Sequence, residues 1–313
     1  MKLCIGTKRG KMANTYVVIA ASIFFCIGFI GNSFTVCFVI FSKQLHTPTY
    51  FMIGCLALSD LLASVTQYVR ILPDPFKSFF NDHYHENIYN IVSFLFIHSA
   101  FFHMVLVSYV RFVFITNPLR SLKLTCKTIL WMSCVVWISS IIVSIGYGAV
   151  IVLLLKNIIS VETLGLNALG FALYVGGLPF IIVVVFNVRK LYYLYNQTAL
   201  IRRTRIANSM SFMFWIIIVM YLLSTIYPLF YIIDFAVLKD RPLLNRSLNL
   251  VHEMFNFSLL VNSCLNPLIY FMFSPPVVRL LSRLRTYCNH GSDPRMSNSG
   301  DLFTISRTST STL

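Results

Sequence analysis

Seven long stretches of this 313-residue chain contain no lysine or arginine and, apart from one aspartate, no acidic residue. They cover residues 12–42, 44–69, 87–110, 128–155, 163–188, 206–233 and 254–278. Each exceeds the roughly 20 residues that an α-helix needs to cross the hydrocarbon of a bilayer. A backbone in lipid must satisfy its own hydrogen bonds, and apolar segments of this length do so as helices. We therefore predict an all-α membrane protein built as a seven-transmembrane helix bundle.

The composition excludes the other broad classes of protein. Hydrophobic residues make up 57% of the chain and charged residues only 11%, whereas soluble proteins are about 45–50% apolar and about 25% charged. Segments of about ten alternating residues, which would indicate a membrane β-barrel, are not seen. The apolar part of the first stretch, residues 16–41, is too long for the core of a signal peptide, so we expect a retained helix.

The basic residues predict the orientation in the membrane. The loops after the first, third and fifth stretches, together with the C-terminal tail, hold 15 of the 25 basic residues and only two acidic ones. The opposite face holds ten basic and seven acidic residues, although four of these basic residues lie in the N-terminus. The positive-inside rule then predicts a multi-pass membrane protein with its N-terminus outside and its C-terminus in the cytoplasm. The basic inner face suits membrane lipids and protein partners, and no soluble basic face is left for nucleic acid.

The chain is expected to have three parts. Residues 1–14 form an extracellular N-terminus, residues 15–288 the membrane domain, and residues 289–313 a disordered cytoplasmic tail rich in glycine, serine and threonine. The end of the membrane domain has the pattern of a short basic amphipathic helix that lies on the inner leaflet. Cys288 closes this helix and is a candidate for palmitoylation, with a plain free thiol as the alternative. The extracellular loops contain no cysteine, so no disulfide can join them.

Several polar residues lie inside the predicted helices, where lipid tolerates them poorly. Asp60 is the acidic residue in the middle of a stretch, and by default such a residue marks a functional site. Asn32, Asn262 and Asn266 are further polar residues in the first and seventh stretches. The alternative role for all four is to hold helices together by hydrogen bonds.

The spacing of these residues resembles that of the rhodopsin-like (class A) G-protein-coupled receptors. The resemblance covers about residues 15–288 and rests on six motifs in order, each in its proper helix. They are Gly31-Asn32, Leu56-Ala57-Leu58-Ser59-Asp60-Leu61, Arg111 seven residues before Pro118, Trp137, the prolines Pro179 and Pro228, and Asn262-Ser263-Cys264-Leu265-Asn266-Pro267-Leu268-Ile269-Tyr270. A short stretch, residues 45–51, also looks like melanocortin and trace-amine receptors, but no subfamily is assigned.

The resemblance implies a switch made of named residues. The polar core of such receptors rearranges on activation, and its members here are Asn32, Asp60, Asn262, Asn266, Pro267 and Tyr270. Pro228 would kink the sixth helix and let its inner end swing. Arg111 would hold the inner ends of the helices together and then contact the G protein.

The chain departs from the family pattern at several of these places. Val110 stands where the family has an acid, so Arg111 lacks its usual salt-bridge partner, and this loss could raise basal activity. Ile226 replaces a tryptophan, Asn187 replaces a tyrosine, and Glu86 replaces a cysteine that most members bond to a loop. A sodium ion at Asp60 stays an open alternative, although Ala100 replaces a serine of the family's sodium site.

The ligand-binding residues follow by position in the family pattern. Ser93 lies where amine receptors carry an aspartate, which disfavours an amine ligand. Leu260 lies where opsins carry the retinal lysine, so no retinal cofactor is expected. The expected lining is apolar and aromatic with a few polar groups, which suits a small or lipidic ligand. Its members are Ser93, Phe94, Ile97, Phe171, Tyr174, Phe230, Ile233 and Asn256, each of which could instead only pack against neighbours.

We therefore expect a G-protein-coupled receptor that transmits an extracellular small-molecule, lipid or peptide signal to heterotrimeric G proteins. A serine- and threonine-rich tail could be phosphorylated and bind arrestin, the terminal Ser311-Thr312-Leu313 resembles a PDZ ligand, and Asn245 begins an outward glycosylation sequon. A decoy receptor that does not couple is the main alternative. A transporter or channel is less favoured because the stretches hold one acid and no repeat, and no enzyme motif occurs in them.

Overall fold

The computed structural model describes residues 2–72, 83–156, 158, 167, 170–171, 173–196, 219, 222, 254 and 256–267. The chain divides into two compact units, residues 1–270 and 271–313, and the second unit lies outside the described residues. The predicted sixth helix falls almost entirely outside them as well. The predicted amphipathic helix and tail, which carry Cys288, also lie outside.

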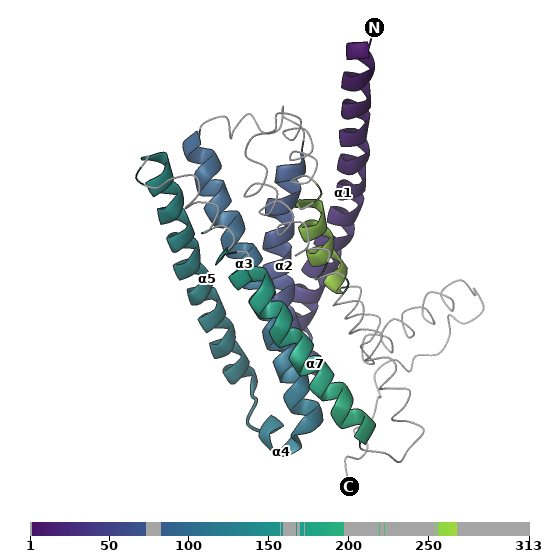
Figure 1. Ribbon diagram of the computed structural model, residues 1–313. Coiled ribbons are helices and arrows are strands. Elements are labelled where there is room, and N and C mark those ends of the chain that lie inside the picture. Colours follow the sequence, from purple (N-terminus) through teal and green to yellow (C-terminus); the bar gives the residue numbers. More distant parts are fainter. Residues whose placement is uncertain are drawn as a thin grey trace, which may run out of the picture. The chain divides into compact units, whose positions relative to one another are not determined.

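The described part of the chain is helical. In chain order its elements are α1 (Lys2–Phe41), the 3₁₀ turn η1 (Lys43–Leu45), α2 (Pro48–Ile71), α3 (His83–Thr116), α4 (Pro118–Ser121), α5 (Cys126–Leu155), the π-helical turn η3 (Leu173–Gly177) and α7 (Leu178–Asn196). A further helical segment covers residues 256–267. α1 contacts α2, and α3 contacts α2, α5 and α7, so three of the other long helices pack against α3 (Figure 1).

Five of these helices are long and apolar enough to cross a membrane. Within the residues that the structure describes, the candidate spans are Thr15–Phe41, Pro48–Ile71, His85–Thr116, Cys126–Leu153 and Leu173–Asn196. They correspond to the first five predicted stretches. The fifth prediction, residues 163–188, ended too early because we stopped each stretch at the first charge. Lys190 is only 5% exposed and has a polar partner, so the helix continues past it to Asn196.

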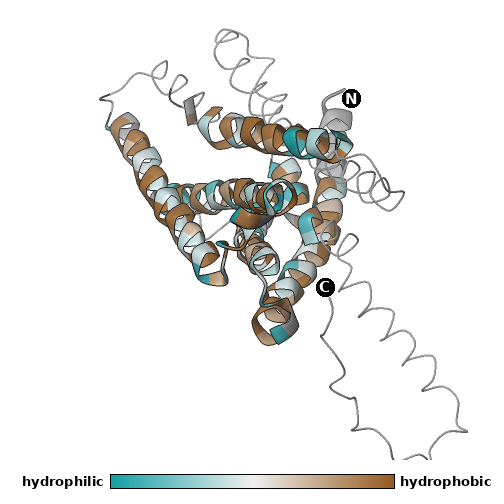
Figure 2. Ribbon diagram, turned by 90° about the horizontal axis from the view of Figure 1, so that it is seen from below, coloured by the Kyte–Doolittle hydropathy of each residue, from teal (hydrophilic) through white to brown (hydrophobic). Residues whose placement is uncertain are grey.

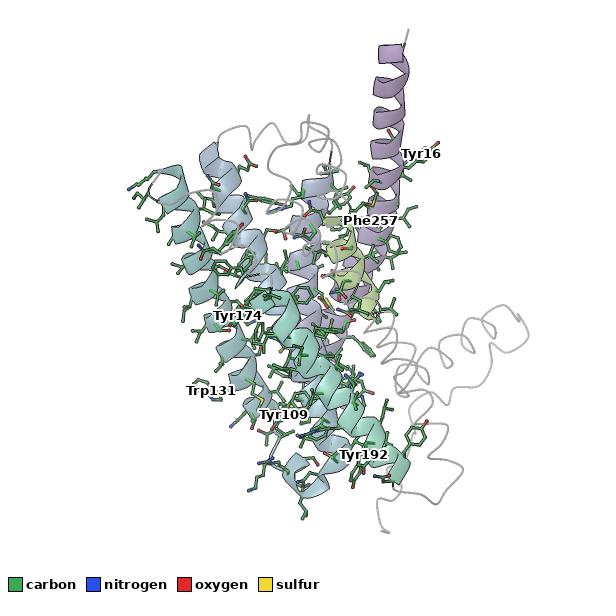
Figure 3. All side chains as sticks on the ribbon, viewed as in Figure 1. Tyr16, Tyr109, Trp131, Tyr174, Tyr192 and Phe257 are labelled. Carbon is green, nitrogen blue, oxygen red and sulfur yellow. The ribbon has the colours of Figure 1, made fainter. Side chains whose placement is uncertain are left out.

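Many polar residues are buried between the helices, and many large apolar residues are exposed on their outer surface. Large apolar side chains on α1 and α5 are exposed, among them Trp131 at 73% (Figure 3). The fully buried residues include Asp60 on α2 and both His98 and His103 on α3. Figure 2 shows hydrophobic residues along the length of the helices. This distribution suits helices surrounded by lipid, where polar groups find hydrogen-bond partners only in each other.

Candidate functional site

The polar core lies where α1 and α2 meet the helical segment 256–267, and we define it as Asn32, Asp60, Ser263 and Asn266. Asn266 donates from Nδ2 to Oδ2 of Asp60 over 2.8 Å, and the Asp60 side chain is 1% exposed. Asn32 donates from Nδ2 to the backbone carbonyl oxygen of Ser263 over 3.1 Å. Three of the predicted switch residues are thus brought together. Their two bonds connect α2 and α1 to residues that are more than 200 positions away in sequence.

The neighbouring predicted residues pack around this core. Asn262 is 5% exposed and Pro267 is buried. A Cβ atom on Gly31 would lie 3.0 Å from Cβ of Pro267, so α1 approaches the segment 256–267 closely at this glycine. Two further predicted switch residues lie outside the described residues. They are Tyr270, which follows the segment 256–267 in sequence, and Pro228 of the predicted sixth helix.

The oxygen atoms near Asp60 fit a sodium ion poorly. The carboxyl group of Asp60 already accepts a hydrogen bond from Asn266. Ala100, which is 7% exposed, offers a methyl group where the family's sodium site has a serine hydroxyl. Hard cations bind through several oxygen ligands, so the absence of this hydroxyl removes one of them.

Arg111 on α3 and Lys190 on α7 are basic residues of two helices that pack together, and we call them the basic pair. Lys190 donates from Nζ to Oδ1 of Asn187 over 2.6 Å, and Asn187 in turn donates to the carbonyl oxygen of Val183 over 2.8 Å. The positive charge of Arg111 is near enough to act on Lys190. Val110, next to Arg111, is fully buried. In the family pattern an acid at the position of Val110 would partner the arginine. Here that position is apolar, and the nearby Lys190 adds a second positive charge.

Three predicted lining residues belong to two adjoining groups of aromatic rings. The first ring cluster consists of Phe94, Tyr147 and Phe171, whose centroids are 4.6 Å (Phe94–Tyr147), 5.8 Å (Phe94–Phe171) and 5.5 Å (Tyr147–Phe171) apart. Stacked and edge-to-face rings at these distances stabilise one another. Because Phe94 lies on α3 and Tyr147 on α5, this cluster joins two helices and the segment before η3.

The second ring cluster consists of His98, Phe102 and Tyr174. The His98 ring stacks on Phe102 at 4.4 Å and on Tyr174 at 5.6 Å, and the Phe102 and Tyr174 rings are 5.7 Å apart. His98 also lies 6.5 Å from Phe94, which joins the two clusters. Tyr174 is part of the π-helical turn η3 (Figure 3), a local widening of the helix that is frequent at functional sites.

The other predicted lining residues are placed separately. Ser93 is fully buried and accepts a hydrogen bond from Nε2 of Gln67 over 3.0 Å. Asn256 is 3% exposed, and its Oδ1 atom has no hydrogen-bond partner among the described residues. Ile97 is half-buried. Phe230 and Ile233 lie outside the described residues, as do the modification candidates Asn245 and Cys288.

The sequence reasoning missed the two buried histidines of α3. His98 and His103 are both fully buried, and each has a ring nitrogen within 2.8 Å of a serine hydroxyl of α5. The signal was available, because an ionisable residue in a membrane span is a candidate for function whether it is an acid or a histidine. We applied that rule only to Asp60. Gln67 was missed for the same reason.

Comparison with known families agrees with the motifs. The family model described as "7 transmembrane receptor (rhodopsin family)" matches residues 31–270. That range contains the described spans from α2 to α7 and the predicted sixth stretch, so the resemblance and the seven-helix fold are confirmed. A search of curated proteins finds no match to the chain.

Proposed function

The chain belongs to the rhodopsin family of seven-transmembrane receptors, and on that premise we propose that it carries a small or lipidic extracellular signal to heterotrimeric G proteins. Membership makes it a multi-pass membrane receptor and not an enzyme, and implies signalling through G proteins. The observation that supports this ligand class is the pair of ring clusters, which combine aromatic surface with the buried imidazole of His98, whose Nε2 atom has no partner among the described residues. Sites of this composition bind mainly apolar molecules and orient them through a few hydrogen bonds.

The polar core is the proposed switch. Asp60 and Asn266 join α2 to the segment 256–267, and Asn32 joins α1 to the same segment. Buried hydrogen bonds between helices exchange partners in discrete steps, because an unpaired polar group in this environment is costly. A ligand that favours one arrangement of these bonds would shift the population of the active state.

The basic pair is the proposed contact for the G protein, and its charge predicts basal activity. In the family pattern an acid neighbours the arginine, but here that position is the buried Val110. Lys190 adds a second positive charge near Arg111. Repulsion between the two side chains disfavours an arrangement that holds α3 and α7 closely together. We therefore expect the inactive state to be less favoured than in receptors that keep the acid.

The remaining assignments are proposals from the sequence. The N-terminus lies outside and the C-terminus inside the plasma membrane, as the basic residues predict. Asn245 then accepts an outward glycan and Cys288 an inner palmitoyl group. The tail recruits arrestin after phosphorylation, and its end binds a PDZ protein.

Ligand-free signalling in cells tests the proposal. Wild type, Arg111→Ala and Val110→Asp are compared at matched surface expression with reporters for the Gs, Gi, Gq and G12 classes. We expect basal activity in the wild type through one class, and a fall in both variants. The matched control is Trp131→Phe on the exposed face of α5, which should signal like the wild type.

The alternative is a decoy receptor that does not couple to G proteins, and two residues of the chain support it. Val110 and Asn187 both depart from the family pattern at the α3–α7 contact. One outcome is a well-expressed chain that is silent in all reporters and stays silent with Val110→Asp and with candidate ligands. That result would support the decoy receptor and contradict the proposed coupling to G proteins. Solute or ion flux through such a silent chain would indicate a transporter or channel.

A further inference from the structure

The strongest unassigned feature of the described residues is the imidazole of His98. It is fully buried on α3, in the second ring cluster between Phe102 and Tyr174. Neither the family match nor the motifs assign a role to it. Its two ring nitrogen atoms have different surroundings, and the difference determines what each can bind.

The hydrogen bond at Nδ1 fixes the tautomer of His98. Nδ1 lies 2.7 Å from Oγ of Ser140. The Ser140 hydroxyl donates its one proton to the carbonyl oxygen of Val136 over 2.8 Å. While it makes that bond it can only accept from His98, which puts the proton of the neutral imidazole on Nδ1. Nε2 is then a hydrogen-bond acceptor.

A positively charged His98 is disfavoured by the same surroundings. The only acidic side chains among the described residues are Asp60 and Glu86. Asp60 is bonded to Asn266, and Glu86 lies about three helical turns from His98 along α3. A buried charge without a partner is unfavourable, so Nε2 remains an acceptor rather than a second donor.

Nε2 of His98 is buried and has no hydrogen-bond partner in the described part of the chain. Buried acceptors without a donor are costly and rare in folded proteins. We propose that Nε2 of His98 accepts a hydrogen bond from the ligand, and that the ligand is therefore an aromatic or other apolar molecule with a hydroxyl or N–H donor at that end. This inference rests on the proposed function, because it places the ligand against the ring clusters.

Two further buried atoms agree with a ligand that donates. Oε1 of Gln67 and Oδ1 of Asn256 are also acceptors without a partner among the described residues. Gln67 uses its amide nitrogen for Ser93, one residue before Phe94 of the first ring cluster. Nε of Arg70, three residues after Gln67 on α2, is a buried donor without a partner among the described residues, so an anionic probe is needed to separate a ligand that donates to the imidazole from a carboxylate held by Arg70.

The test uses three small probes of one shape on the full-length receptor in lipid nanodiscs. They are 4-methylphenol, which has a donor, 1,4-dimethylbenzene, which has none, and 4-methylbenzoate, which is an anion. Binding is measured by the rise in the thermal unfolding midpoint over a concentration series. Nitrogen-15 NMR of the histidine side chains reports in parallel whether Nε2 of His98 is protonated and whether its resonance moves when 4-methylphenol is added.

We expect an unprotonated Nε2 whose resonance moves on saturation with 4-methylphenol, and tighter binding of 4-methylphenol than of the other two probes. In His98→Phe, which keeps a ring but removes the acceptor, 4-methylphenol should bind roughly tenfold more weakly, no better than 1,4-dimethylbenzene. His98→Gln keeps an acceptor oxygen and should retain part of the difference. Trp131→Phe is the control that should change nothing.

Several results would overturn the inference. They are a protonated Nε2, tighter binding of 4-methylbenzoate than of 4-methylphenol, no saturable binding of 4-methylphenol, or equal binding of 4-methylphenol to wild type and His98→Phe. A resonance that does not move on titration would mean that a trapped water already occupies Nε2. The wild-type spectrum decides the tautomer even if a variant fails to fold.

Failure of this inference is separable from failure of the proposed function. If basal signalling depends on Arg111 but His98 has no effect on probe binding, the proposed G-protein signalling is supported and the proposed role of His98 is wrong. If probe binding depends on His98 but the chain activates no G protein, the proposed role of His98 is supported and the proposed G-protein signalling is wrong.

Discussion

Replacing His103 by leucine should lower the thermal unfolding midpoint of the receptor, because this imidazole connects three helices. Its Nδ1 atom lies 2.8 Å from the carbonyl oxygen of Ser99 on its own helix, α3, and 3.2 Å from the hydroxyl of Ser59 on α2. Its Nε2 atom lies 2.8 Å from the hydroxyl of Ser133 on α5. A carbonyl oxygen can only accept, so Nδ1 carries the proton and Nε2 accepts from Ser133.

The size of the effect follows from which partners lose a hydrogen bond. Ser59 keeps backbone acceptors at Cys55 and Leu56, at 2.9 and 3.1 Å. Ser133 loses its bond to Nε2 and retains only the thiol of Cys55 nearby, which is a weak acceptor. The bond from Ser133 is thus the one lost without a good replacement, and a bond between helices is worth about 0.6–1.7 kcal/mol in a membrane protein. For a chain of this size that corresponds to roughly 1–3 °C in the midpoint.

A double-mutant cycle in detergent or nanodiscs measures this bond directly. His103→Leu, Ser133→Ala and the double variant are compared with the wild type by thermal unfolding, and the coupling between the two sites should be about 0.6–1.7 kcal/mol. Ser139→Ala is the control, because Ser139 donates to the carbonyl oxygen of Val136 within its own helix. Additive effects of His103→Leu and Ser133→Ala would refute the reasoning, since two side chains that share a bond cannot act independently.

Two further substitutions, one with its own control, test the packing and the polar core. Gly28→Ala should lower the unfolding midpoint by several degrees, because its Cβ would lie 2.3 Å from Sγ and 2.7 Å from Cα of Cys264. Gly146→Ala, which has nothing within 4 Å of the new Cβ, should leave the midpoint unchanged or raise it slightly. Asn266→Ala removes the donor to Asp60 and should cost about 1–3 kcal/mol, measured by the same unfolding assay. An unchanged midpoint in Gly28→Ala or Asn266→Ala would contradict the close contact or the hydrogen bond, respectively.

The number of helices and the identity of the polar core were predictable from the sequence. Charges are excluded from lipid, so the uncharged stretches mark the spans without any knowledge of packing. Polar groups in lipid must find one another, so Asp60 and Asn266 could be expected to meet. The family motifs led to the same residues.

The environment of each histidine and the burial of Lys190 were not predictable. α5 is apolar on every side, and a helix without a polar face gives no pattern that shows which side faces α3. Whether Ser140 faces His98 therefore depends on how α5 is rotated about its axis. Only the packing of α5 and η3 against α3 decides that rotation.

The sequence by itself thus determined that the chain crosses the membrane, how many times, and that Asn32, Asp60 and Asn266 lie between the helices. These properties depend on the transfer of single residues from water to lipid, which is set by residue type and spacing. Only the tertiary structure decided that Nδ1 of His98 lies beside Ser140 and that Lys190 lies near Arg111. A tautomer or a charge contact depends on distances of a few ångströms between side chains from different helices, and only packing sets those distances.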